Sequence, residues 1–446
     1  MSEGEVAKVI KESIPPLRGR KLDESTIGVV GLGYVGLPLA VSLSNHFDVV
    51  GFDSSDDRIG QLVQHVDITK EVARSALESA TRLELTAEPA VLKKCSIYIV
   101  TVPTPVDASS TPDLSSITQA SETLAKFMSE GDIVIYESTV YPGLTEEICV
   151  PILATNSGLE YNTQFFCGYS PERMNPGDKT RTLQSIVKVT AGSTPEVATL
   201  VDDLYSKVVT AGTFKVESIK IAEAAKIIEN TQRDLNIALI NELAQLFKKL
   251  GIDTQKVLEA ANTKWNFHSY SPGLVGGHCI GVDPYYLVHK AQEIGFATQV
   301  ILAGRSTNDG MAKYVASEVK RLMDVSDTPS ANGDVLVLGL TFKENCSDTR
   351  NSQAISLCCS LVEHGFNVSA SDPFVTSNDL QFKYPSIRFC EHPFGEPSEY
   401  AAVIVAVAHD EYRKKGVEAF KDLLSERGLL FDLKWVFREG DADWRM

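Results

Sequence analysis

The chemically most informative segment surrounds a single cysteine, Cys279, within the stretch PGLVGGHCIGVDPYY (272–286). Glycines on both sides of a cysteine leave its sulfur open and let a ligand approach the backbone closely. A thiolate is a strong nucleophile once nearby N–H dipoles or cations stabilise its charge. Asp283, four residues further on, could serve as a base or as an orienting group. This pattern indicates covalent catalysis by Cys279.

Two other interpretations of this cysteine stay open. A free cysteine is usually a small buried side chain, and Cys279 taken alone would be interpreted that way. It could also bind a metal ion together with His278 and Asp283. Metal ligands usually come in sets of three or four at defined spacings, and no second cluster of Cys or His is present in the sequence. We therefore predict no metal site.

A second chemical pattern is the glycine run GLGYVG (31–36), which follows an apolar, β-branched run and precedes a helical stretch. In this context the glycines permit a tight turn, a close approach of a pyrophosphate to Gly33, and close packing of helix and strand. Asp53 lies 53 − 33 = 20 positions after Gly33, where a carboxylate binds a ribose hydroxyl and repels a 2′-phosphate. Arg58 could stack on the adenine. The pattern predicts NAD; an ordinary strand–helix turn is the alternative.

A third pattern lies on a long helical segment, residues 217–250, which contains neither Gly nor Pro. Lys226 and Asn230 are four residues apart and project from one face of that helix, where they could stabilise an oxyanion. The alternative is a solvated polar face shared with Glu229 and Arg233. The apolar residues of the segment recur at spacings of three, four and seven: Ile221, Ala225, Ile228, Leu235, Leu239, Leu243 and Leu246.

Two α/β regions and a helical region between them would position these residues. Strand-like runs rich in Val and Ile alternate with helical patterns, which predicts two Rossmann-like, doubly wound parallel sheets. The long helix and a helical middle domain would join them. The predicted boundaries are a polar, solvated leader at 1–24, an NAD-binding domain at 25–216, a central helical domain carrying Cys279 at 217–325, and a second α/β domain at 333–446.

Composition narrows the class of protein. The net charge is 42 − 59 = −17, which argues against non-specific binding to nucleic acid or to an anionic membrane. Eight cysteines in 446 residues are too few for a disulfide scaffold, and the first residues are polar and acidic rather than signal-like. These features predict a cytoplasmic enzyme without a membrane segment.

The chain resembles the nucleotide-sugar 6-dehydrogenases, the UDP-glucose and UDP-N-acetylhexosamine dehydrogenases, from about residue 27 to about residue 437. Seven blocks in the same order carry the resemblance: GLGYVGLPLA, TVPTP (101–105), ESTVYPG (137–143), YSPERMNPGD (169–178), EAAKIIENTQRDLNIALINELA (223–244), PGLVGGHCIGVDPYY (272–286) and GLTFKENCSDTRNS (339–352).

The resemblance implies a four-electron oxidation at C6 of a UDP-sugar, with NAD as the acceptor of both hydrides. Cys279 would hold the half-oxidised carbon as a thiohemiacetal and then as a thioester, which water hydrolyses to the uronate. Lys226 and Asn230 would stabilise the oxyanion. Glu172 would act as general base, with Thr139 positioning the water and Asp283 assisting.

The resemblance also assigns binding residues and an assembly. The cofactor would contact Gly31, Gly33, Tyr34, Val35, Gly36, Asp53, Arg58, Thr101, Pro103, Thr104, Ser138, Thr139 and Arg350. The UDP-sugar would contact Glu172, Arg173, Met174, Asn175, Lys226, Asn230, Tyr270, Gly273, Leu274, Gly276, Phe342 and Lys343. Lys343 and Arg350 would close over the active site, although a surface ion pair with Asp348 is the alternative. The apolar stripe of the long helix would form the core of a homodimer.

The predicted substrate rests on one residue that departs from the pattern of the UDP-glucose branch. His278 directly precedes the cysteine, a form more similar to the N-acetylhexosamine branch than to the UDP-glucose branch. We therefore expect UDP-N-acetylglucosamine or UDP-N-acetylgalactosamine as substrate, for polysaccharide biosynthesis, with UDP-glucose and UDP-N-acetylmannosamine as alternatives. A two-electron hydroxyacid dehydrogenase and a non-catalytic sensor of NAD and UDP-sugar are the competing functions.

Overall fold

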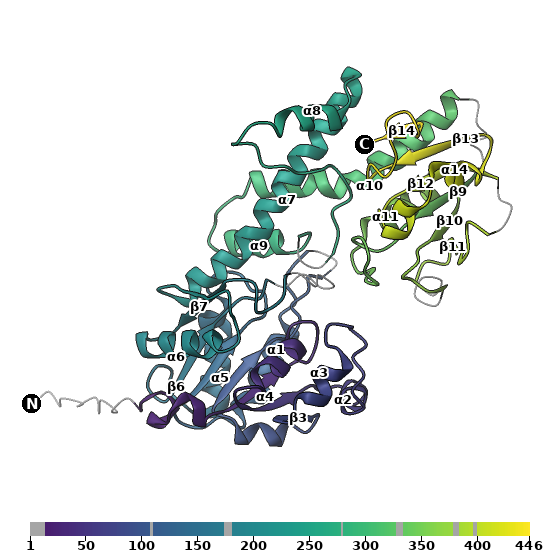
Figure 1. Ribbon diagram of the computed structural model, residues 1–446. Helices are drawn as coiled ribbons and strands as arrows, with labels where there is room; N and C mark the ends of the chain where they lie inside the picture. Colours follow the sequence, from purple (N-terminus) through teal and green to yellow (C-terminus); the bar gives the residue numbers. More distant parts are fainter. Residues whose placement is uncertain are drawn as a thin grey trace, which may run out of the picture. The chain divides into compact units, whose positions relative to one another are not determined.

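The computed structural model in Figure 1 describes residues 14–107, 110–173, 181–277, 280–326, 333–377, 383–395 and 399–446. The chain forms two compact units, the first made of residues 1–228 with 285–290 and the second of residues 229–284 with 291–446. The boundary falls within α7 (Ile219–Leu250), the long helix expected from the sequence. No helix among the described residues combines the length and apolarity that crossing a membrane requires.

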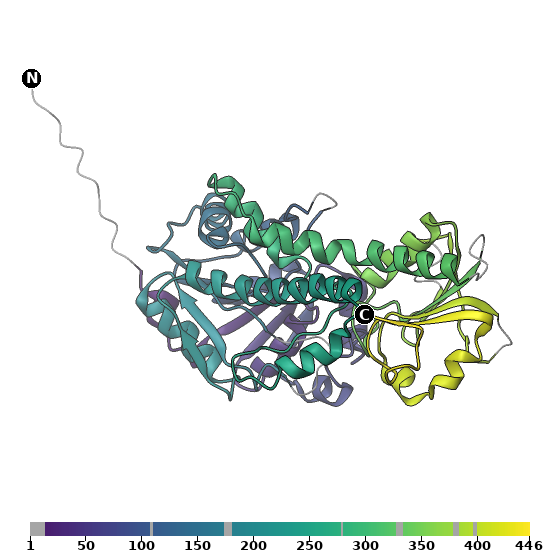
Figure 2. The same ribbon diagram turned by 90° about the horizontal axis from the view of Figure 1, so that it is seen from above.

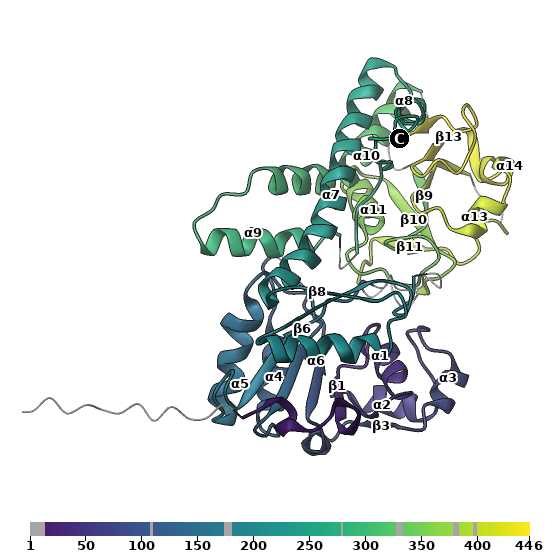
Figure 3. The same cartoon turned by 60° about the vertical axis from the view of Figure 1, so that its left-hand side comes forward.

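The first unit is built on an eight-stranded sheet in the order β3-β2-β1-β4-β5-β6-β7-β8. Its strands are β1 (Thr26–Val30), β2 (Asp48–Phe52), β3 (Leu83–Thr86), β4 (Ile97–Val100), β5 (Asp132–Tyr136), β6 (Phe165–Tyr169), β7 (Lys188–Gly192) and β8 (Thr213–Lys215). Its helices are α1 (Gly36–Leu43), α2 (Asp56–Val63), α3 (Arg74–Ser79), α4 (Ser115–Ala125), α5 (Val150–Ser157) and α6 (Pro195–Ser206), with 3-10 turns at Pro16–Gly19, Leu22–Glu24 and Pro89–Lys94 and a π-helical turn at Thr145–Cys149. α6 packs on β6, β7 and β8, and Figure 3 shows it beside the labelled strands β6 and β8.

Two sequence-based expectations for this unit are wrong. The sheet is not wholly parallel, because β7 runs antiparallel to β6. An antiparallel return needs no crossover helix, and the described parts of the connection, 170–173 and 181–187, contain none. The predicted solvated leader is wrong at Leu17, which is buried in the core and whose main-chain N–H donates to the carbonyl of Gly131 at 2.7 Å, although most residues from 18 to 24 are exposed.

The second unit contains a six-stranded, wholly parallel sheet in the order β11-β10-β9-β12-β13-β14. Its strands are β9 (Asp334–Leu338), β10 (Asn367–Ser371), β11 (Ile387–Phe389), β12 (Tyr400–Val405), β13 (Leu424–Asp432) and β14 (Trp444–Arg445). Its helices, besides the part of α7 from residue 229 on, are α8 (Thr254–Ala261), α10 (Val300–Val325), α11 (Gln353–Glu363), α13 (Asp410–Lys414) and α14 (Val417–Lys421). α9 (Asp283–Glu293) is divided, because residues 285–290 belong to the first unit.

Residue alternation explains how this second sheet is covered on both faces. Along β9, Val335 and Val337 join one apolar cluster with residues of α10 and α11, whereas Leu336 and Leu338 join another with residues of α13 and α14. Side chains two apart on a strand share a face, so a run of consecutive apolar residues fills both layers. Figure 2 shows α10 side by side with α7, against which it packs through Gly304 at Leu235.

Candidate active site

The glycine turn of the first unit has the geometry that a dinucleotide requires. Gly31 ends β1 with φ +93°, a conformation that favours glycine. A Cβ on Gly36 would lie 1.9 Å from the carbonyl oxygen of Gly31 and 2.3 Å from Oγ1 of Thr101, so only glycine fits there. A Cβ on Gly33 would meet nothing within 4 Å, so its backbone is open to a ligand. The residues present therefore fit a bound pyrophosphate.

Asp53 and Arg58 both brace this turn. Oδ2 of Asp53 accepts the main-chain N–H of Leu32 at 2.9 Å. The buried guanidinium of Arg58 donates to the carbonyl of Leu32 at 2.8 Å and pairs with Asp67 at 2.9 Å. Its Nη1 has no hydrogen-bond partner among the described residues. Oδ1 of Asp53 accepts the main-chain N–H of Ser55 at 3.0 Å. Contact of Asp53 with a ribose and stacking of Arg58 on adenine both stay predictions.

The other predicted cofactor residues gather around the same strand ends. Tyr34 and Val35 lie in the turn before α1, and Pro103 is exposed after β4. Thr104 Oγ1 donates to the carbonyl of Thr139 at 2.6 Å, and Ser138 Oγ donates to the carbonyl of Val102 at 2.7 Å. These contacts join the carboxyl ends of β4 and β5, next to β1. In a doubly wound sheet this switch point is where ligands bind.

Glu172 belongs to a buried charged cluster in the first unit that sequence reasoning missed. Its Oε2 lies 2.9 Å from Nζ of Lys188, which also pairs with Oε2 of Glu137 at 3.1 Å. The hydroxyl of Tyr205 donates to the other oxygen of Glu137. Oε1 of Glu172 accepts the main-chain N–H of Arg173 at 2.6 Å. The cluster was missed because its members are far apart in the chain.

Lys226 and Asn230 lie on the buried face of α7, where each is 4% exposed. The alternative of a solvated polar face therefore holds for Glu229 and Arg233, which are exposed, and is wrong for Lys226 and Asn230. Nδ2 of Asn230 donates to Oδ2 of the buried Asp283 at 2.5 Å. This bond connects α7 to the first residue of α9 and fixes the amide in place.

The glycines before Cys279 pack directly on loops of the second sheet. A Cβ on Gly276 would lie 2.4 Å from the carbonyl oxygen of Asn351. Gly277 has φ +85°, and a Cβ there would lie 2.7 Å from the ring of Phe342. Any larger side chain at either position would push these segments apart. The cysteine-bearing segment and the 342–351 loop are thus in contact within the second unit.

The start of the same segment is held by side-chain amides. Asn241 on α7 accepts the N–H of Gly273 at 2.8 Å and donates to its carbonyl at 3.0 Å. Tyr270, just before it, is partly buried. Four residues named in the sequence predictions lie outside the described residues, so their placement stays a prediction: Met174, Asn175, His278 and Cys279.

A pocket in the second unit unites three of the predicted substrate residues. Leu274, Phe342 and Lys343 line it, together with residues at the start of α11 and residues that directly follow β12. It therefore lies at the carboxyl ends of the neighbouring strands β9 and β12, which is the switch point of the second sheet. A helix N-terminus and lysines suit a pyrophosphate. Lys434, which sequence reasoning missed, also lines this pocket.

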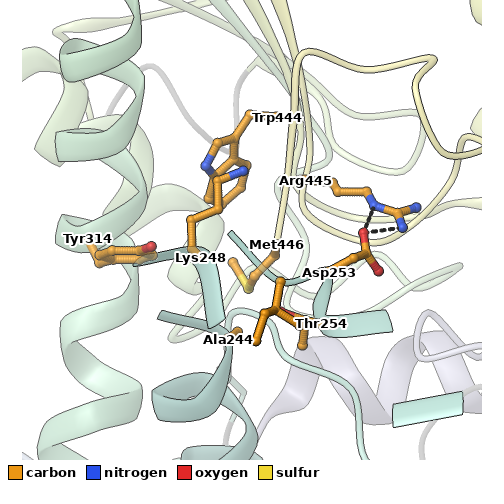
Figure 4. A pocket seen from close by; sticks show the side chains of 9 residues that line it. Ala244, Lys248, Asp253, Thr254, Tyr314, Trp444, Arg445 and Met446 are labelled. Carbon is orange, nitrogen blue, oxygen red and sulfur yellow. Dashed lines mark hydrogen bonds and ion pairs between the residues drawn. The ribbon is translucent and has the colours of Figure 1, made fainter. Parts of the chain in front are cut away.

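Arg350 makes the ion pair with Asp348 that was the alternative considered from the sequence, and its contact with the cofactor stays a prediction. Its guanidinium pairs with Asp348 at 2.7 Å, and its side chain is 56% exposed. A separate pocket of the second unit, drawn in Figure 4, lies among Lys248, Tyr314 and Trp444 and contains none of the predicted site residues. We therefore place the candidate site at the two switch points and not there.

The chain was compared with known families and proteins. Residues 25–209 match the NAD binding domain of the UDP-glucose/GDP-mannose dehydrogenase family, residues 220–310 its central domain, and residues 336–439 its UDP binding domain. The chain belongs to the UDP-glucose/GDP-mannose dehydrogenase family. Membership confirms the resemblance stated from the sequence, the doubly wound α/β fold and NAD as cofactor. It identifies the chain as an NAD-dependent nucleotide-sugar dehydrogenase with a UDP binding domain.

Several proteins of this dehydrogenase family are similar to this chain over nearly its whole length. A UDP-N-acetyl-D-glucosamine 6-dehydrogenase of Pseudomonas aeruginosa is 53% identical over 422 residues, which cover 94% of this chain and 99% of that protein. A protein of the same name from Salmonella typhi is 48% identical, covering 95% and 99%. The solved structure of the UDP-D-ManNAc dehydrogenase from Pyrococcus horikoshii has a TM-score of 0.84 at 29% identity, covering 94% of this chain and 98% of that one.

Proposed function

We propose that this chain oxidises UDP-N-acetyl-D-glucosamine at C6 to the uronate, using Cys279 as a covalent nucleophile. The observation that carries the substrate is the 53% identity, over nearly the whole length of both proteins, with the Pseudomonas aeruginosa UDP-N-acetyl-D-glucosamine 6-dehydrogenase. Two relatives named as UDP-N-acetyl-D-mannosamine dehydrogenases are less similar, at 31% and 34% identity.

One region in each unit supports the proposed pair of ligands, NAD and a nucleotide sugar. The first unit offers an open glycine turn with Asp53, which suits the diphosphate and ribose of NAD. The second offers the start of α11 with Lys343 and Lys434 at the switch point between β9 and β12, which suits the diphosphate of UDP. NAD, when bound, supplies the hydride acceptor.

The protein's own groups would perform the remaining steps. The Cys279 thiolate would add to the C6 aldehyde and prevent its escape between the two oxidations. Lys226 and Asn230 would stabilise the resulting oxyanion, and burial strengthens that effect because water no longer screens them. Asp283 orients the Asn230 amide. Glu172 would take a proton from the hydrolytic water.

We further propose a homodimer built on α7. Four of the seven residues of the apolar stripe expected from the sequence lie on the outward face of this helix: Ile221, Ile228, Leu239 and Leu246 are each between 45% and 56% exposed. The buried face instead carries small and polar residues, among them Glu223, Lys226, Asn230 and Asp234. A stripe of large apolar side chains left in water is typical of an interface.

The decisive experiment supplies the purified protein with NAD and a panel of UDP-sugars. We expect two NADH per UDP-N-acetylglucosamine consumed, with a product whose mass is that of the uronate. One NADH per sugar with free aldehyde would contradict the covalent mechanism, and turnover of another UDP-sugar alone would contradict the substrate. Cys279→Ala should abolish uronate formation while NAD binding is retained, which separates chemistry from folding. Binding of both ligands without turnover would instead support a sensor.

A further inference from the structure

We propose that Lys188 is a positioning residue that holds Glu172 as an oriented carboxylate at the active site, with Glu137 and Tyr205 fixing Lys188 from behind. This inference rests on the proposed function, because it concerns the residue assigned there as general base. Lys188 lies outside every motif that carries the family resemblance. Its role follows from the cluster geometry alone.

The antiparallel return of β7 brings Lys188 back to the segment that follows β6. In the antiparallel pair of β6 and β7, Gly168 pairs with Gly192 and Tyr169 with Ala191. Glu172 lies three residues after Tyr169, and Lys188 lies three residues before Ala191. The two side chains meet beyond the end of β6, with Nζ of Lys188 2.9 Å from Oε2 of Glu172. The antiparallel return that sequence reasoning missed is therefore what creates this pair.

The ammonium group of Lys188 is fully coordinated. Its Nζ lies 2.9 Å from Glu172, 3.1 Å from Glu137 and 3.3 Å from the carbonyl oxygen of Pro171. An ammonium has three N–H donors, so these three acceptors define its direction. Nζ also stands 4.9 Å above the centre of the Tyr205 ring. These four contacts fix the position of the Lys188 ammonium group, and the ammonium group in turn fixes the carboxylate of Glu172.

The ion pair between Lys188 and Glu172 is buried. The side chains of Lys188 and Glu172 are 3% and 7% exposed, and a buried carboxylate without a partner tends to take up a proton. Although burial alone lowers the pKa of Lys188, the charges of Glu137 and Glu172 raise it above its usual value, so the cation persists. Burial raises the pKa of Glu137 despite the neighbouring cation.

Among the described residues, the charged and titratable groups of this cluster come from separate elements. Lys188 begins β7, Glu137 follows β5, Tyr205 belongs to α6, and Arg173 is the neighbour of Glu172 in the chain. Lys188 is the cation that contacts both carboxylates, whereas Arg173 donates to Glu172 through its main-chain N–H. Removing the Lys188 charge therefore leaves two carboxylates in one buried cluster without the cation that they share.

The test compares pH profiles of kcat for Lys188→Met and the parent enzyme. An opposite charge within hydrogen-bonding distance depresses a carboxyl pKa by about 1–3 units. We therefore expect the acid limb of kcat for uronate formation to move up by about 1–3 pH units in Lys188→Met. Lys188→Arg should restore the limb most of the way, because it keeps the charge. Lys215→Met on the neighbouring strand β8, where the lysine is exposed, is the matched control and should leave the limb unchanged.

Two outcomes overturn the proposal. One is a lower kcat in Lys188→Met with an acid limb at the parental pH, which would mark a purely structural lysine. The other is a limb that Lys188→Arg shifts as far as Lys188→Met does. If Lys188→Met folds poorly, Lys188→Met with Glu137→Gln removes the second carboxylate, and its limb should still be displaced. Failure of the proposed function would look different, because the parent enzyme itself would then form no uronate.

Discussion

The first strand of each sheet is followed by the same kind of turn, in which a glycine is followed by a main-chain N–H bonded to an aspartate, but the chain continues differently after each turn. Gly31 ends β1 and Gly339 ends β9, each with φ +93°. In both cases an aspartate at the end of the next strand, Asp53 or Asp372, accepts the main-chain N–H of the residue after the glycine, at 2.9 Å and 2.7 Å. The first turn runs straight into α1, whereas α11 begins only at Gln353.

The second aspartate, Asp372, accepts a hydrogen bond from His409. The main-chain N–H of Asn345 donates to Nδ1 of His409, so Nε2 carries the proton and donates to Asp372 at 2.9 Å. Although burial by itself would raise it, the hydrogen bonds from His409 and the main chain keep the pKa of Asp372 below its usual value. Asp372 is therefore buried and holds a loop together, whereas the corresponding Asp53 is partly exposed and accepts main-chain N–H groups of its own turn and of the start of α2.

The comparison teaches that a shared turn does not imply a shared ligand. At the first turn, glycines bring a helix start close to the strand, and the structure suits a dinucleotide. At the second turn, the Asp372–His409 pair anchors a longer loop that carries Phe342 and Lys343 to the rim of a pocket. A buried, hydrogen-bonded pair can position side chains for recognition without itself touching the ligand.

The largest effect should come from adding one methyl group to the first turn. In Gly36→Ala the new Cβ would meet the main chain at 1.9 Å, and unlike a side chain the main chain cannot rotate away. We expect NAD affinity, measured by titration calorimetry, to fall by about 1000-fold, roughly 4 kcal/mol, more than ordinary overpacking costs. Gly60→Ala on α2, where a Cβ meets nothing within 4 Å, is the control and should bind NAD normally. Equal affinities would refute the assigned cofactor turn.

A pH experiment should separate the two units next. Glu223 in the first unit accepts the N–H groups of Gly143 at 2.5 Å and Thr145 at 3.0 Å, and burial raises its pKa to about 7. Because the folded state holds this proton more tightly than the unfolded state, its contribution to stability is largest below about pH 4.5 and decreases until about pH 7. The shift corresponds to about 3 kcal/mol.

Glu223→Gln should remove that pH dependence. The parent loses stability as the pH rises, whereas the variant lacks this loss. We therefore expect the free energy of unfolding of the variant minus that of the parent to increase by about 3 kcal/mol between pH 5 and pH 8. The measurement is denaturant unfolding followed by circular dichroism. The three tryptophans, Trp265, Trp435 and Trp444, all belong to the second unit, so their fluorescence reports that unit separately. A difference that does not change with pH would contradict the assignment.

Local patterns predicted most of the fold because they depend on neighbouring residues. The apolar runs of β1, β4, β5, β9 and β12, the glycine turn and the uninterrupted α7 all follow from periodicity and turn chemistry. The direction of β7 could not be predicted, since nothing in residues 188–192 encodes whether a strand pairs parallel or antiparallel. The burial of Leu17 was equally hidden, because its main-chain N–H bonds to Gly131, more than a hundred residues away.

The same distinction holds for the site. Gly36, Asp53 and the pair Lys226 and Asn230 could be found from spacing, since each belongs to one turn or one helix face. Which face of α7 is buried could not, because apolar residues normally turn inward and here Ile228 and Leu239 are exposed. Lys188 was also out of reach, because its role depends on a cross-strand register that only the folded sheet defines.

The smallest effect should come from neutralising the two matching aspartates one at a time. Asp53→Asn removes a charged acceptor from the ribose, and a hydrogen bond to a charged group is worth about 1.5–3 kcal/mol. We expect NAD affinity to fall about 10-fold while affinity for UDP is unchanged, with both measured by calorimetry on the full chain. Asp372→Asn should lower the affinity for UDP and leave the affinity for NAD unchanged. This substitution loosens the loop that carries Phe342 and Lys343 and leaves the first turn intact. If Asp372→Asn weakened NAD as much as Asp53→Asn does, the second aspartate would share the cofactor role of the first, and the division of labour between the two turns would be wrong.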